Sequence, residues 1–279
     1  MTKPTALVTG ANSGIGLETT RAIAARGYRT LMLCRNQERA SAAADDIRRT
    51  TPDAHLEIVL GDLGVQTSVR DASAAIIATT DRLDVLVNNA GVTVRKPERT
   101  VENHDVMLAT NQLGPFLLTE LLRPLLVSSA PARVVNVASH AHRFAKTVDL
   151  EHIDSPTSYG LLGMRRYGET KLMNILWTRE LSRRLDGTHV TANSLHPGAV
   201  RSNLGSPAAW QKALVQPFML IAEKGAETSV FLATDPSVAD ATGGYWAKCN
   251  QADAKLTDAA SDDALAARLW DTCATLTSL

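Results

Sequence analysis

Two side chains suited to acid–base chemistry, Tyr167 and Lys171, lie four residues apart in a stretch that predicts a helix. Residues at this spacing on a helix point from the same face. A tyrosine phenol ordinarily has a pKa of about 10 and does not ionise near neutral pH without help. A neighbouring ammonium favours the phenolate, so the pair is a candidate for giving and accepting a proton.

Two further polar residues are placed where they could join this pair. Ser139 directly follows a predicted strand, and its hydroxyl could bind a carbonyl oxygen at the carboxyl edge of a sheet. Asn111 lies inside a predicted helix. The alternative for both is structural: a turn residue at a strand end, and a polar group satisfied within its own helix.

A glycine-rich turn follows the first predicted strand and leads into a helix. Glycines in the pattern Gly-x-x-x-Gly-x-Gly let the chain turn tightly and let a pyrophosphate approach the backbone. The helix N-terminus behind the turn offers free N–H groups and a positive dipole end. The alternative is a glycine-rich turn without a ligand. The candidate dinucleotide-binding residues here are Gly10, Asn12, Ser13, Gly14, Ile15 and Gly16.

The end of the second predicted strand indicates which dinucleotide would bind. Sites that prefer NAD usually place a carboxylate here to accept a hydrogen bond from the ribose 2′-hydroxyl. Cys34 holds that position instead and is followed by Arg35 and Asn36. Because a guanidinium suits a 2′-phosphate, the sequence favours NADPH/NADP+, with Arg35 and Asn36 among the cofactor-binding residues.

The third and fourth predicted strands also end in polar turns, where an adenine and a ribose could lie. Asp62 and Leu63 follow the third strand, and Asn89, Ala90 and Gly91 close the fourth. The Asp62 carboxylate could accept a hydrogen bond from the adenine amino group. Asp, Asn and Gly are also common in turns without a ligand, which is the alternative for each.

Short apolar strands alternate with longer helical patterns along the chain. Near-continuous hydrophobic strands are typical of a parallel sheet covered on both faces. Their alternation with helices predicts a single α/β domain over residues 1–279, a Rossmann-type doubly wound parallel sheet. The expected strands are Thr5–Thr9, Arg29–Cys34, His55–Leu60, Leu83–Val87, Arg133–Ala138 and His189–Leu195. The expected helices are Gly14–Arg26, Gln37–Thr50, Gln66–Thr79, Val101–Val127 and Arg165–Leu185.

Two long connections, at about residues 140–164 and 197–220, interrupt this alternation. Both follow the carboxyl ends of predicted strands, where open α/β sheets bind ligands, so we expect substrate loops there. Their apolar residues suit a bulky, weakly polar compound, although the same residues could simply pack the loops onto the body. His140 and His142 lie next to the proposed oxygen site at Ser139, but no carboxylate or third histidine stands at metal-ligand spacing, so no metal is expected.

Composition excludes several classes of protein. The 279 residues carry 29 basic and 29 acidic side chains, without the excess of positive charge expected of a general nucleic-acid binder. The three cysteines are far apart and odd in number, which argues against a disulfide framework and favours a reducing, cytoplasmic compartment. The sequence shows no apolar run of the roughly 20 residues that span a bilayer, so no membrane anchor is expected.

Taken together, these motifs resemble the short-chain dehydrogenase/reductase family. The resemblance covers residues 5 to about 250, and within the family the chain is most similar to the retinol-dehydrogenase-like group and to some ketoreductases of antibiotic pathways. The matching motifs are TGANSGIG, Asp62-Leu63, NNAG, Asn111, Ser139, Tyr167-x-x-x-Lys171 and Pro197-Gly198.

The resemblance implies a role for each matching residue. Tyr167 would be the proton donor or acceptor, and Lys171 would lower its pKa and hold the nicotinamide ribose. Ser139 would bind the substrate oxygen, and Asn111 would anchor a water in a proton relay toward Lys171. Three further residues would border the nicotinamide: Pro197, Gly198 and Val200.

The resemblance therefore implies an NADPH-dependent enzyme that interconverts a ketone or aldehyde and an alcohol. It also implies a homodimer or homotetramer paired through the helices near residues 101–127 and 165–185. Thr170 stands where the family usually has serine. We expect no N-terminal anchor of the kind that membrane-bound retinol dehydrogenases carry, so the resemblance does not extend to a retinoid substrate. The alternatives are a non-catalytic NADPH-binding sensor and a family member turned to epimerisation or cyclisation.

Overall fold

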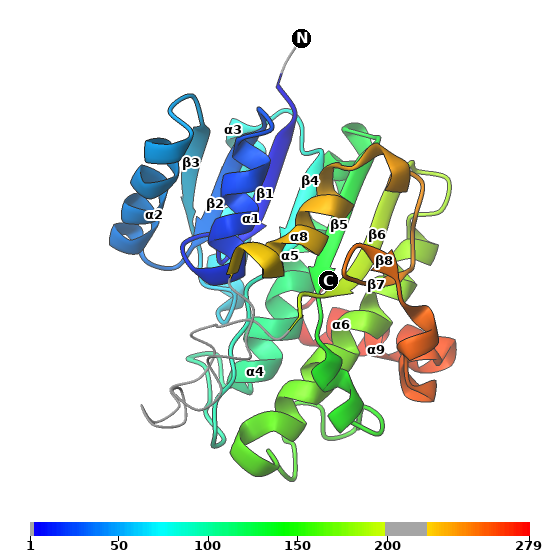
Figure 1. Ribbon diagram of the computed structural model, residues 1–279. Coiled ribbons are helices and arrows are strands. Elements are labelled where there is room, and N and C mark those ends of the chain that lie inside the picture. The colour runs from blue at the N-terminus through cyan, green and yellow to red at the C-terminus, as the bar shows by residue number, and fades with distance from the viewer. Residues whose placement is uncertain (1–2, 199–221) are drawn as a thin grey trace.

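The computed structural model describes residues 3–198 and 222–279, in which eight strands form one sheet (Figure 1). The strand order is β3-β2-β1-β4-β5-β6-β7-β8, and every neighbouring pair is parallel except β7 and β8. The strands are β1 Thr5–Thr9, β2 Arg29–Cys34, β3 His55–Leu60, β4 Val85–Asn88, β5 Ala132–Val137, β6 Val190–His196, β7 Tyr245–Ala247 and β8 Asn250–Gln251. The reversal of strand order between β1 and β4 is the point at which doubly wound sheets bind ligands.

Helices cover both faces of the sheet, which confirms the predicted Rossmann-type doubly wound architecture (Figure 1). The described helices are α1 Gly14–Ala24, α2 Gln37–Thr50, α3 Gln66–Thr79, α4 Val106–Leu108, α5 Gly114–Ser128, α6 Met164–Arg184, α8 Ala222–Thr234 and α9 Asp263–Leu276. One core lies between the sheet and α1, α2 and α8; the other lies beneath α3, α5, α6 and α9. Alternation along β1 sends Leu7 to the second core and its neighbours Ala6 and Val8 to the first.

Most of the predicted elements are confirmed, and one helix is corrected. The bounds of β1, β2, β3, α2 and α3 agree with the expected ranges, and β4, β5, β6, α1 and α6 differ only at their ends. The predicted helix over residues 101–127 begins only at Val106, because Asp105 caps α4 by accepting a hydrogen bond from the Leu108 N–H at 2.8 Å. A wide turn of π-helix over Ala109–Leu113 then separates α4 from α5.

Candidate active site

Tyr167 and Lys171 lie on the first turns of α6 and face the same space. Gly163, whose φ of +80° is left-handed, precedes the helix, and a Cβ there would lie 2.0 Å from the Val94 carbonyl oxygen. Glycine therefore allows α6 to begin directly against the segment that follows β4. One turn apart, the Lys171 Nζ lies 5.7 Å from the centre of the Tyr167 ring. The structure thus brings together the two residues that the sequence analysis paired.

The Lys171 ammonium is held from two sides. Its Nζ donates to the Val137 carbonyl oxygen at 2.7 Å and to the Asn174 Oδ1 at 3.1 Å. The side chain is buried, and this burial lowers the pKa of Lys171 from 10.5 to about 8, since a charged group loses hydration there. The group can therefore exchange a proton in the mildly alkaline range.

Ser139 completes a triangle with this pair. It follows β5 and caps the short helix His140–Phe144, its Oγ accepting a hydrogen bond from the Ala141 N–H at 3.1 Å. The Ser139 hydroxyl also forms a side-chain hydrogen bond with Tyr167. The end of β5 and the start of α6 thus place two hydroxyl groups next to each other, as a substrate oxygen would require.

The pKa of Tyr167 differs in direction from the sequence expectation. Burial raises it to about 12, and the hydrogen bond with Ser139 only partly opposes this shift. The Lys171 ammonium donates to Val137 and Asn174 rather than to the phenol, so the effect of burial prevails over the attraction of this charge for a phenolate. In this structure Tyr167 is therefore a protonated phenol, the form that can donate a proton.

Asn111 lies in the π-helical turn and connects three parts of the site. Its Oδ1 accepts from the Val92 N–H at 2.7 Å, and its Nδ2 donates to the Val92 carbonyl at 2.9 Å and to the Thr170 Oγ1 at 3.0 Å. The Thr170 hydroxyl in turn donates to the Tyr167 carbonyl at 2.8 Å. Asn111 is therefore a fully engaged structural residue whose part in a proton relay stays a prediction.

Asn174 joins the site, and the sequence analysis did not single it out. Its Nδ2 donates to the Asn111 carbonyl oxygen at 2.8 Å, while its Oδ1 accepts from Lys171. The resemblance places a water on the path from Asn111 to Lys171; here a side chain links the two directly. The sequence does show Asn174 as a further polar residue on the same helix as Tyr167 and Lys171. Its hydrogen-bond partner Asn111 is 63 residues away in sequence, so no local pattern connects the two.

The glycine-rich turn after β1 has the backbone that its sequence predicts. Gly10 and Gly14 have positive φ angles of 64° and 54°. A Cβ at Gly16 would lie 2.2 Å from the Gly10 carbonyl oxygen, so only glycine lets α1 begin so close to the turn. The side chain of Ser13 makes no capping bond, and the first turn of α1 carries no acidic residue. The N-terminus of α1 therefore fits an anionic group.

Thr9 ties this turn to the end of β4, a role that sequence reasoning missed. Its Oγ1 accepts hydrogen bonds from the N–H groups of Asn89 and Ala90, at 2.9 and 3.0 Å. The Asn89 Nδ2 donates to the Thr9 carbonyl at 2.9 Å. Gly91 follows, and a Cβ there would lie 3.6 Å from the Lys171 Nζ. The predicted cofactor residues at the ends of β1 and β4 thus lie between α1 and Lys171.

Three residues at the end of β2 differ in their surroundings: Cys34 is buried, Arg35 is exposed and Asn36 caps the next helix. Cys34 is buried, which raises the pKa of its thiol to about 11 although the Ala11 and Asn12 N–H groups hydrogen-bond to it. Arg35 is exposed, and the described residues offer its guanidinium no hydrogen bond or ion pair. The Asn36 Oδ1 caps α2 by accepting from the Arg39 N–H at 2.8 Å. The structure thus assigns Asn36 a helix-capping role, while Arg35 remains available to a ligand.

The remaining predicted residues have mixed outcomes. The Asp62 Oδ1 accepts from the Gly64 N–H at 2.8 Å, the turn role that was its alternative, and Leu63 is buried in a core. Pro197 and Gly198 follow β6, and Gly198 has a φ of +90°. Val200 and most of the predicted loop over 197–220 lie outside the described residues.

An aromatic and histidine cluster lies beside Ser139. The rings of His140 and His196 stack with their centres 3.8 Å apart, and the His142 Nδ1 bonds to the Ser139 carbonyl at 2.8 Å. Burial lowers the pKa of His196 to about 4, with smaller contributions from neighbouring positive charge. It also lowers the pKa of His140 and of His142. All three imidazoles are therefore neutral at physiological pH and shape the end of β5.

A buried ion pair, also unforeseen, fixes the start of α6. The Arg166 guanidinium donates to the Asp105 carboxylate at 3.0 Å and to the Glu169 carboxylate at 3.2 Å. The Tyr159 hydroxyl donates to the same Asp105. Arg166 is 1% exposed and directly precedes Tyr167, so α4 and the 140–164 segment together hold Tyr167 in place.

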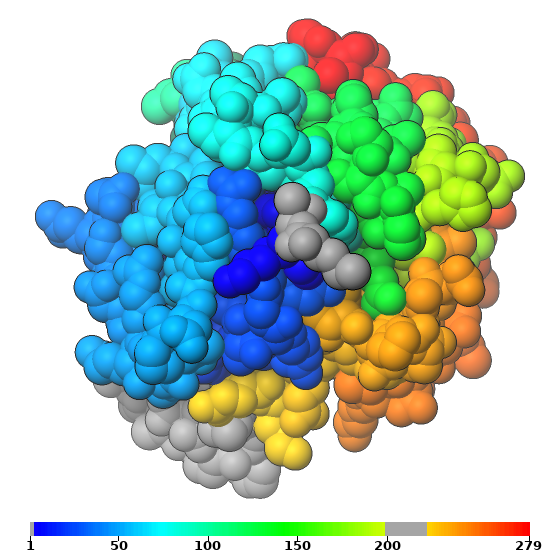
Figure 2. All heavy atoms as spheres, turned by 90° about the horizontal axis from the view of Figure 1, so that it is seen from above, coloured from blue at the N-terminus to red at the C-terminus, as the bar shows by residue number. Residues whose placement is uncertain are grey.

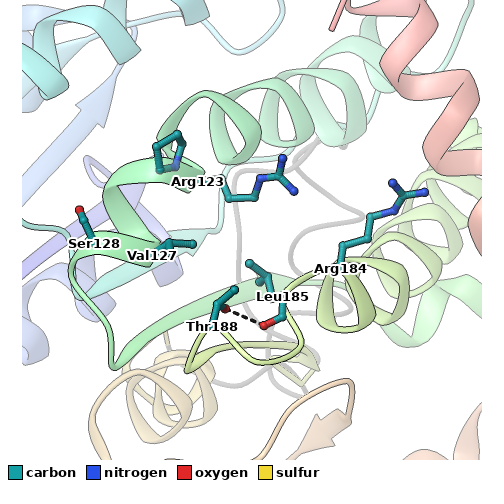
Figure 3. Close-up of a pocket in the computed structure, with 7 residues that line it drawn as sticks. Arg123, Val127, Ser128, Arg184, Leu185 and Thr188 are labelled. Carbon is teal, nitrogen blue, oxygen red and sulfur yellow. Dashed lines mark hydrogen bonds between the residues drawn. The ribbon is translucent and has the colours of Figure 1, made fainter.

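A surface pocket of about 440 Å³ lies elsewhere, between the ends of α5 and α6 (Figure 3). The pocket lies between the end of α5 and the end of α6, at the amino edge of the sheet. Figure 2 shows this edge from above. Tyr167 lies 17 residues before Arg184 on α6, or about 25 Å at 1.5 Å per residue. This pocket is therefore not part of the candidate site. Its lining residues are Arg123, Pro124, Val127, Ser128, Arg184, Leu185 and Thr188.

Comparison with known proteins agrees with this geometry. A family model described as short chain dehydrogenase matches residues 4–148. Human "Dehydrogenase/reductase SDR family member 13" is 38% identical over 281 residues, which are 99% of this chain and 73% of that protein. Mouse "Retinol dehydrogenase 14" is 38% identical over 284 residues, covering 96% of this chain and 84% of that protein.

A solved structure shares the fold over almost the whole chain. It is a putative uncharacterized protein from Mycobacterium paratuberculosis, with a TM-score of 0.77 and 28% identity, covering 99% of this chain and 93% of the other. None of the helices in the described residues is long and apolar enough to cross a membrane. The fold and the relatives both correspond to one family.

Proposed function

This chain belongs to the short-chain dehydrogenase/reductase family, oxidoreductases acting on CH–OH and C=O groups, and on that premise we propose that it uses NADPH/NADP+ to interconvert a bulky ketone or aldehyde and its alcohol. The observation that carries the proposal is the placement of Tyr167. Its phenol is bonded to Ser139, and the Lys171 Nζ lies 5.7 Å from its ring. A proton donor, an oxygen-binding hydroxyl and a cation therefore meet at one point.

The residues around the β1 turn fit a dinucleotide. Free N–H groups at the start of α1 would hold the pyrophosphate, and Lys171 would hold the nicotinamide ribose. The bound cofactor would supply a hydride to the carbonyl carbon, or accept one from the alcohol carbon. Asn89, Ala90 and Gly91 lie between these two places and would border the cofactor.

The preference for NADPH rests on Arg35 and Cys34. Arg35 follows β2 with an exposed guanidinium, and the position before it holds a buried thiol instead of a carboxylate. A 2′-phosphate would therefore meet a positive charge and no negative one at the end of β2. Asn36 would contribute to cofactor binding through its position at the start of α2, because its Oδ1 is already engaged in capping that helix.

The chain's own residues would handle the proton. Burial keeps Tyr167 protonated, so its hydroxyl can donate to the substrate oxygen as that oxygen gains negative charge. The Ser139 hydroxyl would donate a second hydrogen bond to the same oxygen. The Lys171 ammonium would stabilise the phenolate left behind, because an opposite charge nearby favours the ionised form.

Exposed apolar side chains near the site support a bulky, weakly polar substrate. Phe144, Leu161, Leu162 and Met164 are all more than a third exposed, and all lie between the end of β5 and the start of α6. Phe144 lies close to α6 beside Tyr167, since a Cβ added at Gly168 would lie 3.2 Å from the Cβ of Phe144. These side chains would shield the reacting groups from water when an apolar substrate binds.

The proposal is tested by incubating the purified protein with NADPH and a panel of aromatic and terpenoid ketones and aldehydes. We expect loss of reduced-nicotinamide absorbance that depends on the carbonyl compound, together with the matching alcohol in product analysis. NADH in place of NADPH should give slower oxidation. Tight NADPH binding without oxidation by any member of the panel would favour a sensor instead.

A further inference from the structure

Asn174 is a buried amide whose hydrogen bonds all point to the reaction centre or to its support. The side chain is 5% exposed and lies one turn beyond Lys171 on α6. Its Nδ2 donates to the Asn111 carbonyl at 2.8 Å and to the Gln112 Oε1 at 3.0 Å. Its Oδ1 accepts from the Lys171 Nζ at 3.1 Å. Every polar atom of this amide therefore has a partner.

The partners also fix which way the amide points. A main-chain carbonyl can only accept a hydrogen bond, so the NH₂ group must face Asn111. The Oδ1 is then directed to Lys171. The Asn174 backbone is held as well, because its carbonyl accepts from the Thr178 Oγ1 at 2.6 Å, and that hydroxyl accepts from the Asn136 Nδ2 of β5 at 2.8 Å.

The π-helical turn provides the other end of this link. The Gly114 N–H donates to the Ala109 carbonyl, five residues earlier, instead of following the α-helical pattern. Such widened turns are often found at functional sites. Here the turn presents the Asn111 carbonyl to α6, where Asn174 reaches it. Two segments distant in sequence are thereby joined through one side chain to the ammonium.

Two acceptors use two of the three donors of the Lys171 ammonium. Val137 and Asn174 hold it from β5 and from α6, and its nitrogen, which carries one further N–H, lies 5.7 Å from the centre of the Tyr167 ring. Among residues 3–198 and 222–279, the titratable side chain beside Lys171 is Tyr167, and burial is the cause of the lowered pKa of the lysine. A neutral acceptor at this position therefore offsets part of the cost of burying the charge.

We propose that Asn174 is a positioning residue, whose Oδ1 holds the Lys171 ammonium near Tyr167 and favours the charged form of the lysine. The hydrogen bond from its Nδ2 to the Asn111 carbonyl fixes the amide in this orientation. This inference rests on the proposed function only for its effect on turnover. Loss of the Oδ1 should make Lys171 give up its proton more easily. A carboxylate in the same place should make it hold the proton more firmly.

The test compares Asn174→Leu with Asn174→Asp, which have nearly the same size and opposite electrostatic effects. In the leucine variant, the fall in the rate of NADPH oxidation at alkaline pH should begin about one pH unit lower than in the wild type. In the aspartate variant, this fall should begin about one pH unit or more higher than in the wild type. Asn193→Leu is the matched control, since Asn193 is an equally buried amide bonded to Ala241, Gly244 and Trp246. That variant should lose stability without moving the profile.

A second measurement separates this inference from the proposed function. The Lys171 side chain is titrated by NMR with isotopically labelled lysine, and its signal is identified by its loss in Lys171→Met. If the wild type oxidises no NADPH, the proposed function fails, while the titration still decides the role of Asn174. Equal Lys171 titrations in the wild type and the aspartate variant would overturn the inference, even if the leucine variant does not fold.

Discussion

At the scale of single residues, the proposed chemistry depends on the Tyr167 hydroxyl. It is bonded to Ser139 in a site where burial raises its pKa to about 12, so it can donate a proton but does not lose one to water. Tyr167→Phe removes this hydroxyl and leaves the ring. We expect turnover to fall well over tenfold, since general acid catalysis contributes about 10² to 10⁴ in rate. NADPH binding, measured by fluorescence titration, should change little.

Tyr28→Phe is the control for this substitution. Tyr28 directly precedes β2, at the amino edge of the sheet and therefore at the end away from Ser139. Its substitution removes the same atom and should leave turnover within about twofold. Wild-type turnover in Tyr167→Phe, across every substrate that the wild type accepts, would remove Tyr167 from the mechanism.

Lys171 makes a prediction about pH. Its pKa is lowered from 10.5 to about 8, so raising the pH through 8 removes the positive charge that, in the proposed mechanism, would stabilise the Tyr167 phenolate. We expect the rate of carbonyl reduction to be constant below this value and to fall above it, in a profile of kcat/KM against pH. Lys171→Met should have a low rate and no such fall.

The free energy of unfolding should change in the opposite direction to the activity when Lys171 loses its proton. Between pH 8 and 10.5 the unfolded chain still binds the proton that folded Lys171 has lost, so this group makes the folded state more stable as pH rises. A loss of activity in this range is therefore not caused by unfolding through Lys171. Denaturant unfolding of the wild type and of Lys171→Met at two pH values checks this: the difference in unfolding free energy between the two proteins should shift in favour of the wild type at the higher pH.

At the scale of elements, the end of β2 makes a prediction about the cofactor. Arg35 presents an unpaired, exposed guanidinium there, among the residues the structure describes, so Arg35→Asp replaces attraction to a 2′-phosphate with repulsion. We expect Kd for NADPH to rise at least about tenfold, and the ratio of NADPH to NADH turnover to fall by more. Steady-state kinetics with both cofactors measures the ratio.

Arg268→Asp makes the same change of charge on the exposed side of α9 and serves as the control. It should alter neither Kd nor the ratio, which shows that the effect of Arg35 is local rather than one of net charge. If unmodified protein already uses NADH better than NADPH, the argument from Arg35 is wrong.

The elements also show why part of the structure could be predicted and part could not. β1, β2 and β3 carry local patterns that define a strand whatever surrounds it, and their predicted bounds are those observed. β7 and β8 have only three and two residues and are strands because they pair with β6 and with each other. No element after residue 195 was assigned from the sequence, although Asp262 caps α9 and is a local signal of a helix start.

The site divides in the same way. Tyr167 and Lys171 could be paired because one helical turn joins them, and Ser139 could be added because it ends a strand. The link from Lys171 through Asn174 to Asn111 depends on how α6 packs against the π-helical turn, which no local pattern records. The ion pair of Arg166 with Asp105 is of the same kind, since 61 residues separate the two.

At the scale of the whole molecule, part of α5 and part of α6 are enclosed by the rest of the chain. Residues 111–119, in the π-helical turn and the start of α5, and residues 170–178, in the middle of α6, are all buried without a break. Nine consecutive helical residues cover two and a half turns, so no face of either helix is left exposed there. α9 provides part of this cover: Trp270 packs edge-on against Phe116 of α5, with ring centres 4.9 Å apart, and lies beneath Arg184 of α6.

This enclosure bears on the expected homodimer or homotetramer. Pairing through α5 and α6 would need apolar surface on them, and the buried stretches 111–119 and 170–178 offer none, in part because α9 covers them. We therefore expect a monomer, with a mass near 29.9 kDa in light scattering at micromolar concentration. A dimer whose mass returns to that of one chain in Trp270→Ala would contradict the argument, because it would place α9 inside the interface. A dimer that persists in that variant would instead locate the pairing surface away from α5 and α6.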